Sequence, residues 1–303
     1  MTARALVVAT ALIIAACGGE STMAAPPSFA GITPSTVTYC TDSGRAETLD
    51  MYEPSRGASP HPLLMVVHGG SWAFGSSSLR QQNPLTQMTV TALLSRGFAV
   101  ASINYRLAPA DPWPAQIIDT RCAVRYLRAS AARWHIDTRR FAVLGNSAGA
   151  HLASLTALSD GLEPQWDNGQ FAGQSSGFAA VVDCWGPADL AAPGWSAVAV
   201  AIGRPVFGTA WGSDSDALRV ASPVTYVHPA APPFLIVQGS SDALVPPRQS
   251  AELDARLVAA GDPVSVIAVA HAGHELIPSG APISPNLGAL TERVVAFLES
   301  AVG

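Results

Sequence analysis

Short, almost purely apolar runs alternate with longer segments of helical periodicity along this chain of 303 residues, and this alternation is the strongest constraint on its fold. Strands are expected at residues 63–67, 98–104, 141–144, 178–184, 234–237 and 264–269. Helices are expected at residues 84–96, 114–134, 148–158, 247–260 and 287–300. Strands that are apolar throughout are buried on both faces, and helices between them can cross over to parallel neighbours. The sequence therefore predicts an α/β fold with a mostly parallel sheet covered by helices on both faces.

Two further segments refine this architecture. Residues 37–40 and 48–52 have strand-like patterns with no helix between them, so they predict an antiparallel edge of the sheet. Residues 186–232 are less regular and contain many Gly, Pro, Trp and Ser residues, so we expect a small cap over one end of the sheet. No repeat and no linker divides residues 36–303, which we expect to form one domain.

The composition excludes several classes of function. Apolar residues make up 49% of the chain and charged residues 13%, which supports a substantial core. The net charge of −5 is spread without long runs, so no nucleic-acid partner is expected. All 17 basic residues are arginine. Without lysine there can be no Walker phosphate site, no Schiff base and no Ser-x-x-Lys nucleophile.

The N-terminus has the pattern of an export signal. A short positive segment, residues 1–4, precedes an apolar run at 5–16 that is too short to span a bilayer. The small residues before Cys17 resemble the bacterial lipobox, in which the cysteine is lipidated after cleavage. We expect a lipoprotein signal at 1–17, a flexible tether at 18–35, and an exported protein held to the membrane only by its N-terminal lipid. The alternative is a plain secretory signal.

Three cysteines remain after the signal, namely Cys40, Cys122 and Cys184. An odd number in an exported protein predicts one disulfide and one buried free thiol, and the sequence leaves the pairing open. Because no C-x-x-C motif is present, a zinc site is not expected.

Polar residues follow the apolar runs where ligands bind in sheets of this kind, at the carboxyl ends of the strands. Ser147 follows one run in the motif G-x-S-x-G, between Gly145 and Gly149. A tight strand-to-helix turn of this kind raises the serine hydroxyl out of the sheet, and the glycines avoid collisions with the neighbouring strand and helix. The amide of Ala148, at a helix N-terminus, can receive a developing negative charge. We therefore expect Ser147 to be a nucleophile, the alternative being a helix N-cap serine.

A serine nucleophile also needs further oxyanion donors and a substrate pocket. His68, Gly69 and Gly70 follow another strand, and we expect the amides of Gly70 and Ser71 to join Ala148 as donors, although the sequence does not decide which of residues 69–71 point inward. Trp72 is expected either to line the substrate pocket or to fill the core.

The general base and its acid partner are expected after the last two strands. We take His274 as the base and His271 as the alternative, because His274 lies farther into the loop. Asp242 is the expected acid, with Asp183 as its competitor. A metal site at His271-x-x-His274 would lack the H-E-x-x-H pattern and a third ligand, so no metal is expected.

The assembled residues resemble an α/β-hydrolase, because the triad order Ser147, Asp242, His274 is the order of that fold. Several stretches resemble the hormone-sensitive-lipase-like esterases, and more closely the bifunctional feruloyl/acetyl-esterase-like proteins. They are "HGGSWAFGS", "INYRLAPADPWPAQIIDTRCAVRYLR", "FAVLGNSAGAHLA", "VVDCWGPADL", "ASPVTYV" and "PFLIVQGSSDALVPPRQSAEL".

The resemblance implies an eight-stranded α/β-hydrolase fold and a cofactor-free serine esterase for short-acyl or feruloyl/acetyl-type esters, including esters on polysaccharides. Ser71 replaces the third glycine of the lipase loop, and the pattern H-G-G-x-W also resembles kynurenine-formamidase-like hydrolases. A formamidase or peptidase of the same fold is therefore an alternative, as is a binding lipoprotein with little turnover.

Overall fold

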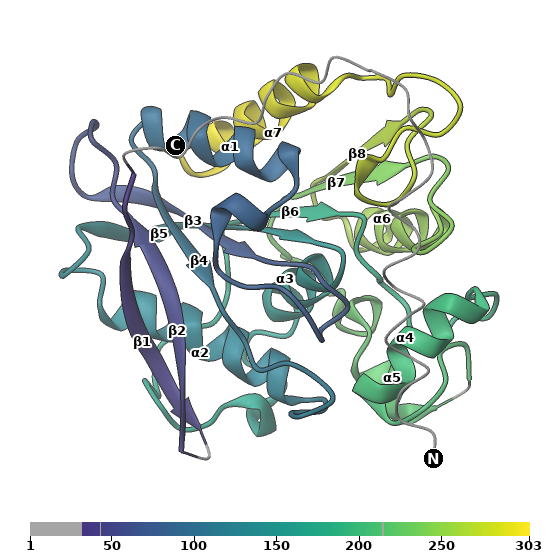
Figure 1. Cartoon of the computed structure of the whole chain (residues 1–303). Coiled ribbons are helices and arrows are strands. Elements are labelled where there is room, and N and C mark those ends of the chain that lie inside the picture. The colour runs from purple at the N-terminus through teal and green to yellow at the C-terminus, as the bar shows by residue number, and fades with distance from the viewer. Residues whose placement is uncertain (1–31, 43, 214) are drawn as a thin grey trace.

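The computed structural model describes residues 32–303 except 43 and 214, and its centre is an eight-stranded sheet (Figure 1). The strands are β1 Ser35–Asp42, β2 Arg45–Tyr52, β3 His61–Val67, β4 Ala99–Ile103, β5 Ile136–Asn146, β6 Ala180–Cys184, β7 Phe234–Gly239 and β8 Val264–Val269. Their spatial order is β1-β2-β4-β3-β5-β6-β7-β8. The expected signal at 1–17, Cys17 within it, and residues 18–31 of the expected tether lie outside the described residues.

The strand directions confirm the predicted sheet. β1 pairs antiparallel with β2 and β2 antiparallel with β4, whereas all other neighbours are parallel. β5 begins at Ile136, five residues before the expected strand, because the polar stretch 137–140 hides the strand pattern in the sequence. The sheet is thus an α/β-hydrolase sheet with an antiparallel edge.

Alternate side chains of one strand enter two different cores. In β3, Leu63, Met65 and Val67 belong to the core on one face, and Leu64 and Val66 to the core on the other. This double burial explains why the central strands are apolar throughout.

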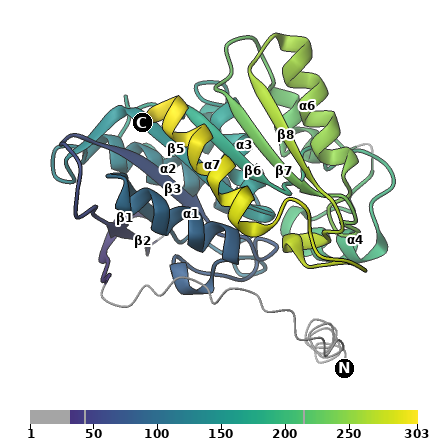
Figure 2. The ribbon, with the colours of Figure 1, turned by 90° about the horizontal axis from the view of Figure 1, so that it is seen from above.

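Five main helices cover the two faces (Figures 1 and 2). They are α1 Pro84–Ser95 and α7 Leu287–Val302 on one face, and α2 Ala115–Ala129, α3 Ala148–Leu158 and α6 Arg248–Ala260 on the other. Asn83 and Asn286 cap α1 and α7 with their side-chain oxygens. No helix in the described part of the chain is both long and apolar enough to cross a membrane.

The segment between β6 and β7 contains α4 Ala197–Phe207, α5 Asp216–Val220 and a short 3₁₀ turn at Pro223–Tyr226. This is the region that the sequence predicts as a cap, and α4 and α5 lie to the side of the sheet, away from α1 and α7 (Figure 1). Phe207 of α4 packs its ring near Trp72, with centroids 5.2 Å apart. The segment therefore contributes an aromatic wall beside the sheet.

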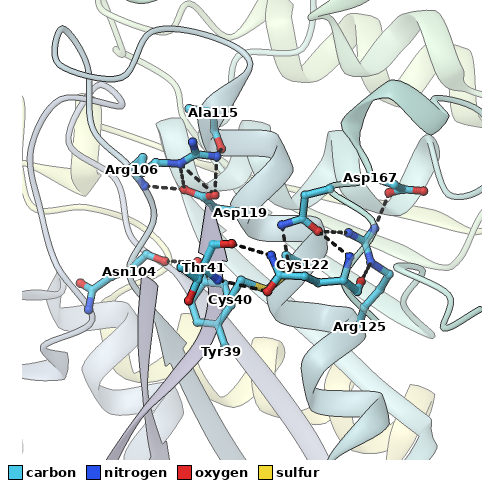
Figure 3. Close-up of a disulfide and its surroundings, with 12 residues drawn as sticks. Tyr39, Cys40, Thr41, Asn104, Arg106, Ala115, Asp119, Cys122, Arg125 and Asp167 are labelled. Carbon is cyan, nitrogen blue, oxygen red and sulfur yellow. Dashed lines mark hydrogen bonds and ion pairs between the residues drawn. A yellow bond between two sulfur atoms is a disulfide. The ribbon is translucent and has the colours of Figure 1, made fainter. Parts of the chain in front are cut away.

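One disulfide joins the edge strand to a helix (Figure 3). Cys40 of β1 bonds to Cys122 of α2, which settles the pairing that the sequence left open. Cys184 is a buried free cysteine. Beside the disulfide, Arg106 donates hydrogen bonds to both carboxylate oxygens of buried Asp119. This corner of the sheet is thus held by a covalent link and by a paired buried charge.

Candidate active site

Ser147 lies at the turn between β5 and α3, with φ 52° and ψ −117°. A Cβ on Gly145 would lie 2.2 Å from the carbonyl oxygen of Gly149, and a Cβ on Gly149 would lie 2.1 Å from that of Val67. Neither position can therefore carry a side chain, which is the steric reason for the G-x-S-x-G spacing. Ser147 occupies the N-cap position of α3, but its side chain accepts no capping hydrogen bond. The hydroxyl is therefore available for another partner.

That partner is His274, in the short 3₁₀ turn His274–Leu276 after β8. The Nε2 atom of His274 lies 3.0 Å from Oγ of Ser147, and its Nδ1 lies 2.8 Å from Oδ2 of Asp242. Nδ1–H donates to the carboxylate, which leaves Nε2 to accept the Ser147 hydroxyl proton. The structure thus brings together the three residues that the sequence selected from loops far apart in the chain.

The Asp242 carboxylate is held from two sides. Its Oδ1 accepts hydrogen bonds from the backbone amides of Leu244 and Val245, both at 2.9 Å, and its side chain is fully buried. Gly239 lets the loop after β8 approach the end of β7, since a Cβ at position 239 would lie 2.5 Å from the carbonyl oxygen of Ala272. The acid is therefore fixed in place before any ligand binds.

The competing residues make other contacts. The Asp183 carboxylate accepts hydrogen bonds from Oγ of Ser154 at 2.6 Å and from the amide of Gly186 at 2.8 Å. Burial raises the pKa of Asp183. The His271 side chain is exposed and has no hydrogen bond to Ser147 among the described residues. Neither alternative joins the Ser147 cluster.

No sequence motif singles out Trp185, which follows β6. Its ring is 1% exposed and lies edge to face with His274, with centroids 6.4 Å apart. A buried apolar ring therefore packs beside the imidazole. The motif around it, "VVDCWGPADL", did not reveal this contact because the two residues are 89 positions apart, from 185 to 274.

The loop after β3 lies directly against the Ser147 turn. A Cβ on Gly69 would lie 2.9 Å from the carbonyl oxygen of Asn146, so only glycine permits this approach. Among the described residues, the amides of Gly70 and Ser71 donate to no acceptor. The third expected donor, Ala148, is the first residue of α3. These amides are therefore available for a ligand oxygen near Ser147.

His68 stabilises the loop after β3. Its Nδ1 donates to the carbonyl oxygen of Gly69 at 2.7 Å, and its ring stacks on Tyr105 at 4.2 Å. Burial lowers the pKa of His68 to about 4, so the ring is neutral near pH 7. The Tyr105 hydroxyl also donates to the carbonyl oxygen of His68. These contacts hold the loop in one conformation.

Trp72 is only 2% exposed and belongs to an aromatic cluster. It lies edge to face with His151 at 5.1 Å and with Trp211 at 5.6 Å. Of the two roles that the sequence left open, the structure therefore favours the core. Contact of Trp72 with a substrate stays a prediction.

A groove of about 1240 Å³ adjoins the Ser147 turn. Gly69, Gly70 and Asn146 line it, as do Glu275 and Leu276, which follow directly after His274. The sequence does not reveal this groove, because its walls come from segments separated by about 190 residues. Within the described residues, no three His, Cys, Asp or Glu side chains gather into a site that could hold a metal ion.

Known proteins resemble this chain both in sequence and in structure. The model of the BD-FAE family matches residues 49–257. Esterase LipC of Mycobacterium tuberculosis is 30% identical over 251 residues, which are 81% of this chain and 61% of LipC. Esterase LipQ of the same organism is 31% identical over 72% of this chain and 51% of LipQ. The chain thus spans only about half to three fifths of these relatives.

Solved structures share the fold. A truncated form of a carbohydrate esterase from gut microbiota superposes with a TM-score of 0.75 at 25% identity, over 91% of this chain and 99% of that one. The propionate-bound esterase Est2 of Thermogutta terrifontis gives a TM-score of 0.71 at 21% identity, over 88% and 94%. Both likenesses extend over nearly the whole described chain.

Proposed function

The chain belongs to the BD-FAE family and has the α/β-hydrolase fold, and from this premise we propose that it is a serine carboxylic-ester hydrolase that uses Ser147, His274 and Asp242. The observation that carries the proposal is the pair of hydrogen bonds on the His274 ring, 3.0 Å to Oγ of Ser147 and 2.8 Å to Oδ2 of Asp242. A nucleophile, a base and an orienting acid in this geometry are the requirements of acyl transfer.

In the first half of the reaction, Oγ of Ser147 attacks the ester carbonyl carbon while Nε2 of His274 takes the hydroxyl proton. The carbonyl oxygen becomes an alkoxide, which the amides of Gly70, Ser71 and Ala148 stabilise. The alkoxide then collapses, the bond to the alcohol oxygen breaks, and His274 gives that oxygen its proton. An alcohol leaves, and the acyl group remains on Ser147.

In the second half, water attacks the acyl-enzyme and His274 takes a proton from it. Collapse of the second alkoxide returns the proton to Oγ of Ser147 and releases the carboxylic acid. The Asp242 carboxylate stabilises the imidazolium each time it forms and holds Nδ1 in the donor tautomer. The buried carboxylate supports this role, because two backbone amides hold its orientation.

We extend the proposal to esters with short acyl groups, including acetyl or feruloyl esters of carbohydrates. The relatives named as esterases and the similar carbohydrate esterase support this substrate class. The sequence before the described residues supports export and lipid attachment at Cys17. In a detergent phase-separation assay, a Cys17→Ser variant that still enters the detergent phase would contradict the lipid anchor.

The test is covalent labelling followed by turnover. A fluorophosphonate should modify the wild type at Ser147 and leave Ser147→Ala unmodified. Hydrolysis of 4-nitrophenyl esters from acetate to palmitate should fall steeply with chain length and vanish in the variant. Methyl ferulate and N-formylkynurenine belong in the same panel. Faster turnover of the amide would favour a formamidase, and absence of both labelling and turnover would favour a binding lipoprotein.

A further inference from the structure

The groove beside Ser147 is lined by residues that adjoin Ser147 and His274. Residues 275–288, between His274 and the start of α7, form one wall, and residues 81–88, before and within α1, form the other. Gly69, Gly70 and Asn146 also line the groove. Asn146 directly precedes Ser147, and a Cβ on Gly69 would lie 3.5 Å from Cβ of Ser147. At about 1240 Å³ the groove exceeds the usual size of a small-molecule site. It has room for a far larger group than a simple alkanol.

The position of His274 indicates which part of an ester would enter this groove. The leaving oxygen must accept the proton from Nε2 of His274, so the alcohol part has to lie on the histidine side of Ser147. The chain runs from His274 directly into the groove wall at Glu275 and Leu276. The groove therefore begins where the leaving group must depart.

An aromatic cluster fills the space beside the start of α3, and none of its rings lines the groove. Trp72, His151, Phe207 and Trp211 pack there in edge-to-face and tilted pairs, with ring centroids between 5.1 and 6.1 Å apart. His151 lies one turn after Ser147 on α3 and is fully buried. A bulky substituent cannot enter this cluster without displacing aromatic rings, so the open space is on the α1 and α7 side.

The charge of the groove is one-sided. Glu275 is the one carboxylate that lines it, and no arginine lines it in the described part of the chain. The lining histidine, His68, is neutral near pH 7. Glu275 has φ 56° and ψ 22°, a left-handed conformation that costs about 1–3 kcal/mol in a residue other than glycine. Its side chain is exposed and forms no ion pair with any described residue. Its carboxylate therefore lines the groove without an ion-pair partner among the described residues, in a position to attract a cationic group bound there.

We propose that this groove is the leaving-group subsite of the esterase, that it takes a bulky alcohol, and that Glu275 makes it select uncharged or cationic alcohols over anionic ones. This inference rests on the proposed function, because it assigns the alcohol side of the same reaction. It predicts that the size and charge of the alcohol affect kcat/KM through residues that do not touch the acyl group.

Gly288 offers a way to block the groove without strain. It lines the groove near the start of α7, and a Cβ there would meet only Oδ1 of Asn286, at 3.5 Å. A Gly288→Phe variant therefore places a ring in the groove. The neighbouring Ala289 is exposed and does not line the groove, so Ala289→Phe is the matched control.

The size test compares benzyl acetate with 4-phenylbenzyl acetate, which extends the alcohol, and with benzyl 4-phenylbutanoate, which extends the acyl group. Gly288→Phe should lower the kcat/KM ratio of 4-phenylbenzyl to benzyl acetate about tenfold or more, because the distal ring loses its apolar contact. The acyl-extension ratio should not change, and Ala289→Phe should leave both ratios unchanged. A loss confined to the acyl-extended ester, or no change in either ratio, overturns the assignment.

The charge test compares acetylcholine with its uncharged isostere 3,3-dimethylbutyl acetate and with anionic 3-sulfopropyl acetate. Glu275→Gln should lower the kcat/KM ratio of the cationic to the neutral ester about two- to fivefold. It should raise the kcat/KM ratio of the anionic to the neutral ester by a similar factor. Because all three share the acetyl group, effects on His274 itself cancel in the ratios. The wild-type preference should weaken with salt. Glu252→Gln, on α6 at the opposite face, should change nothing.

The two levels of the proposal fail in different ways. If hydrolysis requires Ser147 but neither Gly288→Phe nor Glu275→Gln changes the kcat/KM ratios, the subsite is overturned and the proposed esterase activity stands. No hydrolysis that depends on Ser147 overturns both.

Discussion

The stability of this protein should depend on pH through His151, which is buried and cannot accept a proton without cost. Its Nε2–H donates to the carbonyl oxygen of Ala221 at 2.7 Å, and its Nδ1 has no partner among the described residues. The ring lies among Trp72, Trp113 and Phe207. Burial in these apolar surroundings lowers the pKa of His151 from 6.5 to about 4.

The direction of the effect follows from which state binds the proton. Between pH 6.5 and pH 4 the unfolded chain protonates this histidine and the folded chain does not, so acid favours unfolding. The contribution of the neutral ring is fully present above pH 6.5 and is lost as the pH falls toward 4. A pKa lowered from 6.5 to about 4 corresponds to a loss of about 2 kcal/mol by pH 5 and about 3 kcal/mol by pH 4.

The measurement is the free energy of unfolding from urea titrations at pH 7, 6, 5 and 4, for the wild type and for His151→Gln. Glutamine keeps a donor for the Ala221 carbonyl and does not titrate. Buried carboxyls such as Asp183 also change stability with pH, but they are common to both proteins and cancel in the difference. The free energy of unfolding of the wild type minus that of the variant should therefore fall by about 3 kcal/mol from pH 7 to pH 4. A difference that stays constant over this range would refute the buried neutral ring.

Three further outcomes are expected. Asp242→Asn should lower kcat by about 10⁴-fold with little change in Tm, because the amide lets His274 adopt the wrong tautomer; a loss below tenfold in ester turnover would contradict the role of the acid. Gly149→Ala should destabilise the protein by about 3 kcal/mol or more in thermal unfolding, since its Cβ would lie 2.1 Å from a β3 carbonyl oxygen; an unchanged Tm would be inconsistent with this contact. Replacing both Cys40 and Cys122 by serine removes a disulfide that spans 82 residues and should lower the free energy of unfolding by about 4–5 kcal/mol. Equal urea midpoints for the oxidised wild type and the variant would show that the disulfide does not stabilise the protein.

The sequence by itself predicted the class of fold and selected Ser147 as the candidate nucleophile. Runs that are almost purely apolar indicate strands covered on both faces, and the structure confirms this for β3, β4, β6, β7 and the second half of β5. The expectation was wrong for β8, which is an edge strand in which Ser265, Val266 and Ala268 are exposed. The helix at 148–158 was expected with the bounds that the structure has. Ser147 could be selected because its motif is local. Gly145 and Gly149 are required by contacts within one strand, one turn and the next helix.

The tertiary structure alone decided everything that depends on residues far apart in the chain. Both His271 and His274 follow the last strand, and only the path of that loop across the sheet edge brings His274 to Ser147. The pairing of Cys40 with Cys122 depends on how α2 packs against the edge strand. Local patterns record backbone conformation and burial, which are properties of short segments. Distances between loops are set by sheet order and helix packing. The groove that Glu275 lines is built from several distant segments, so no single stretch of sequence predicts it.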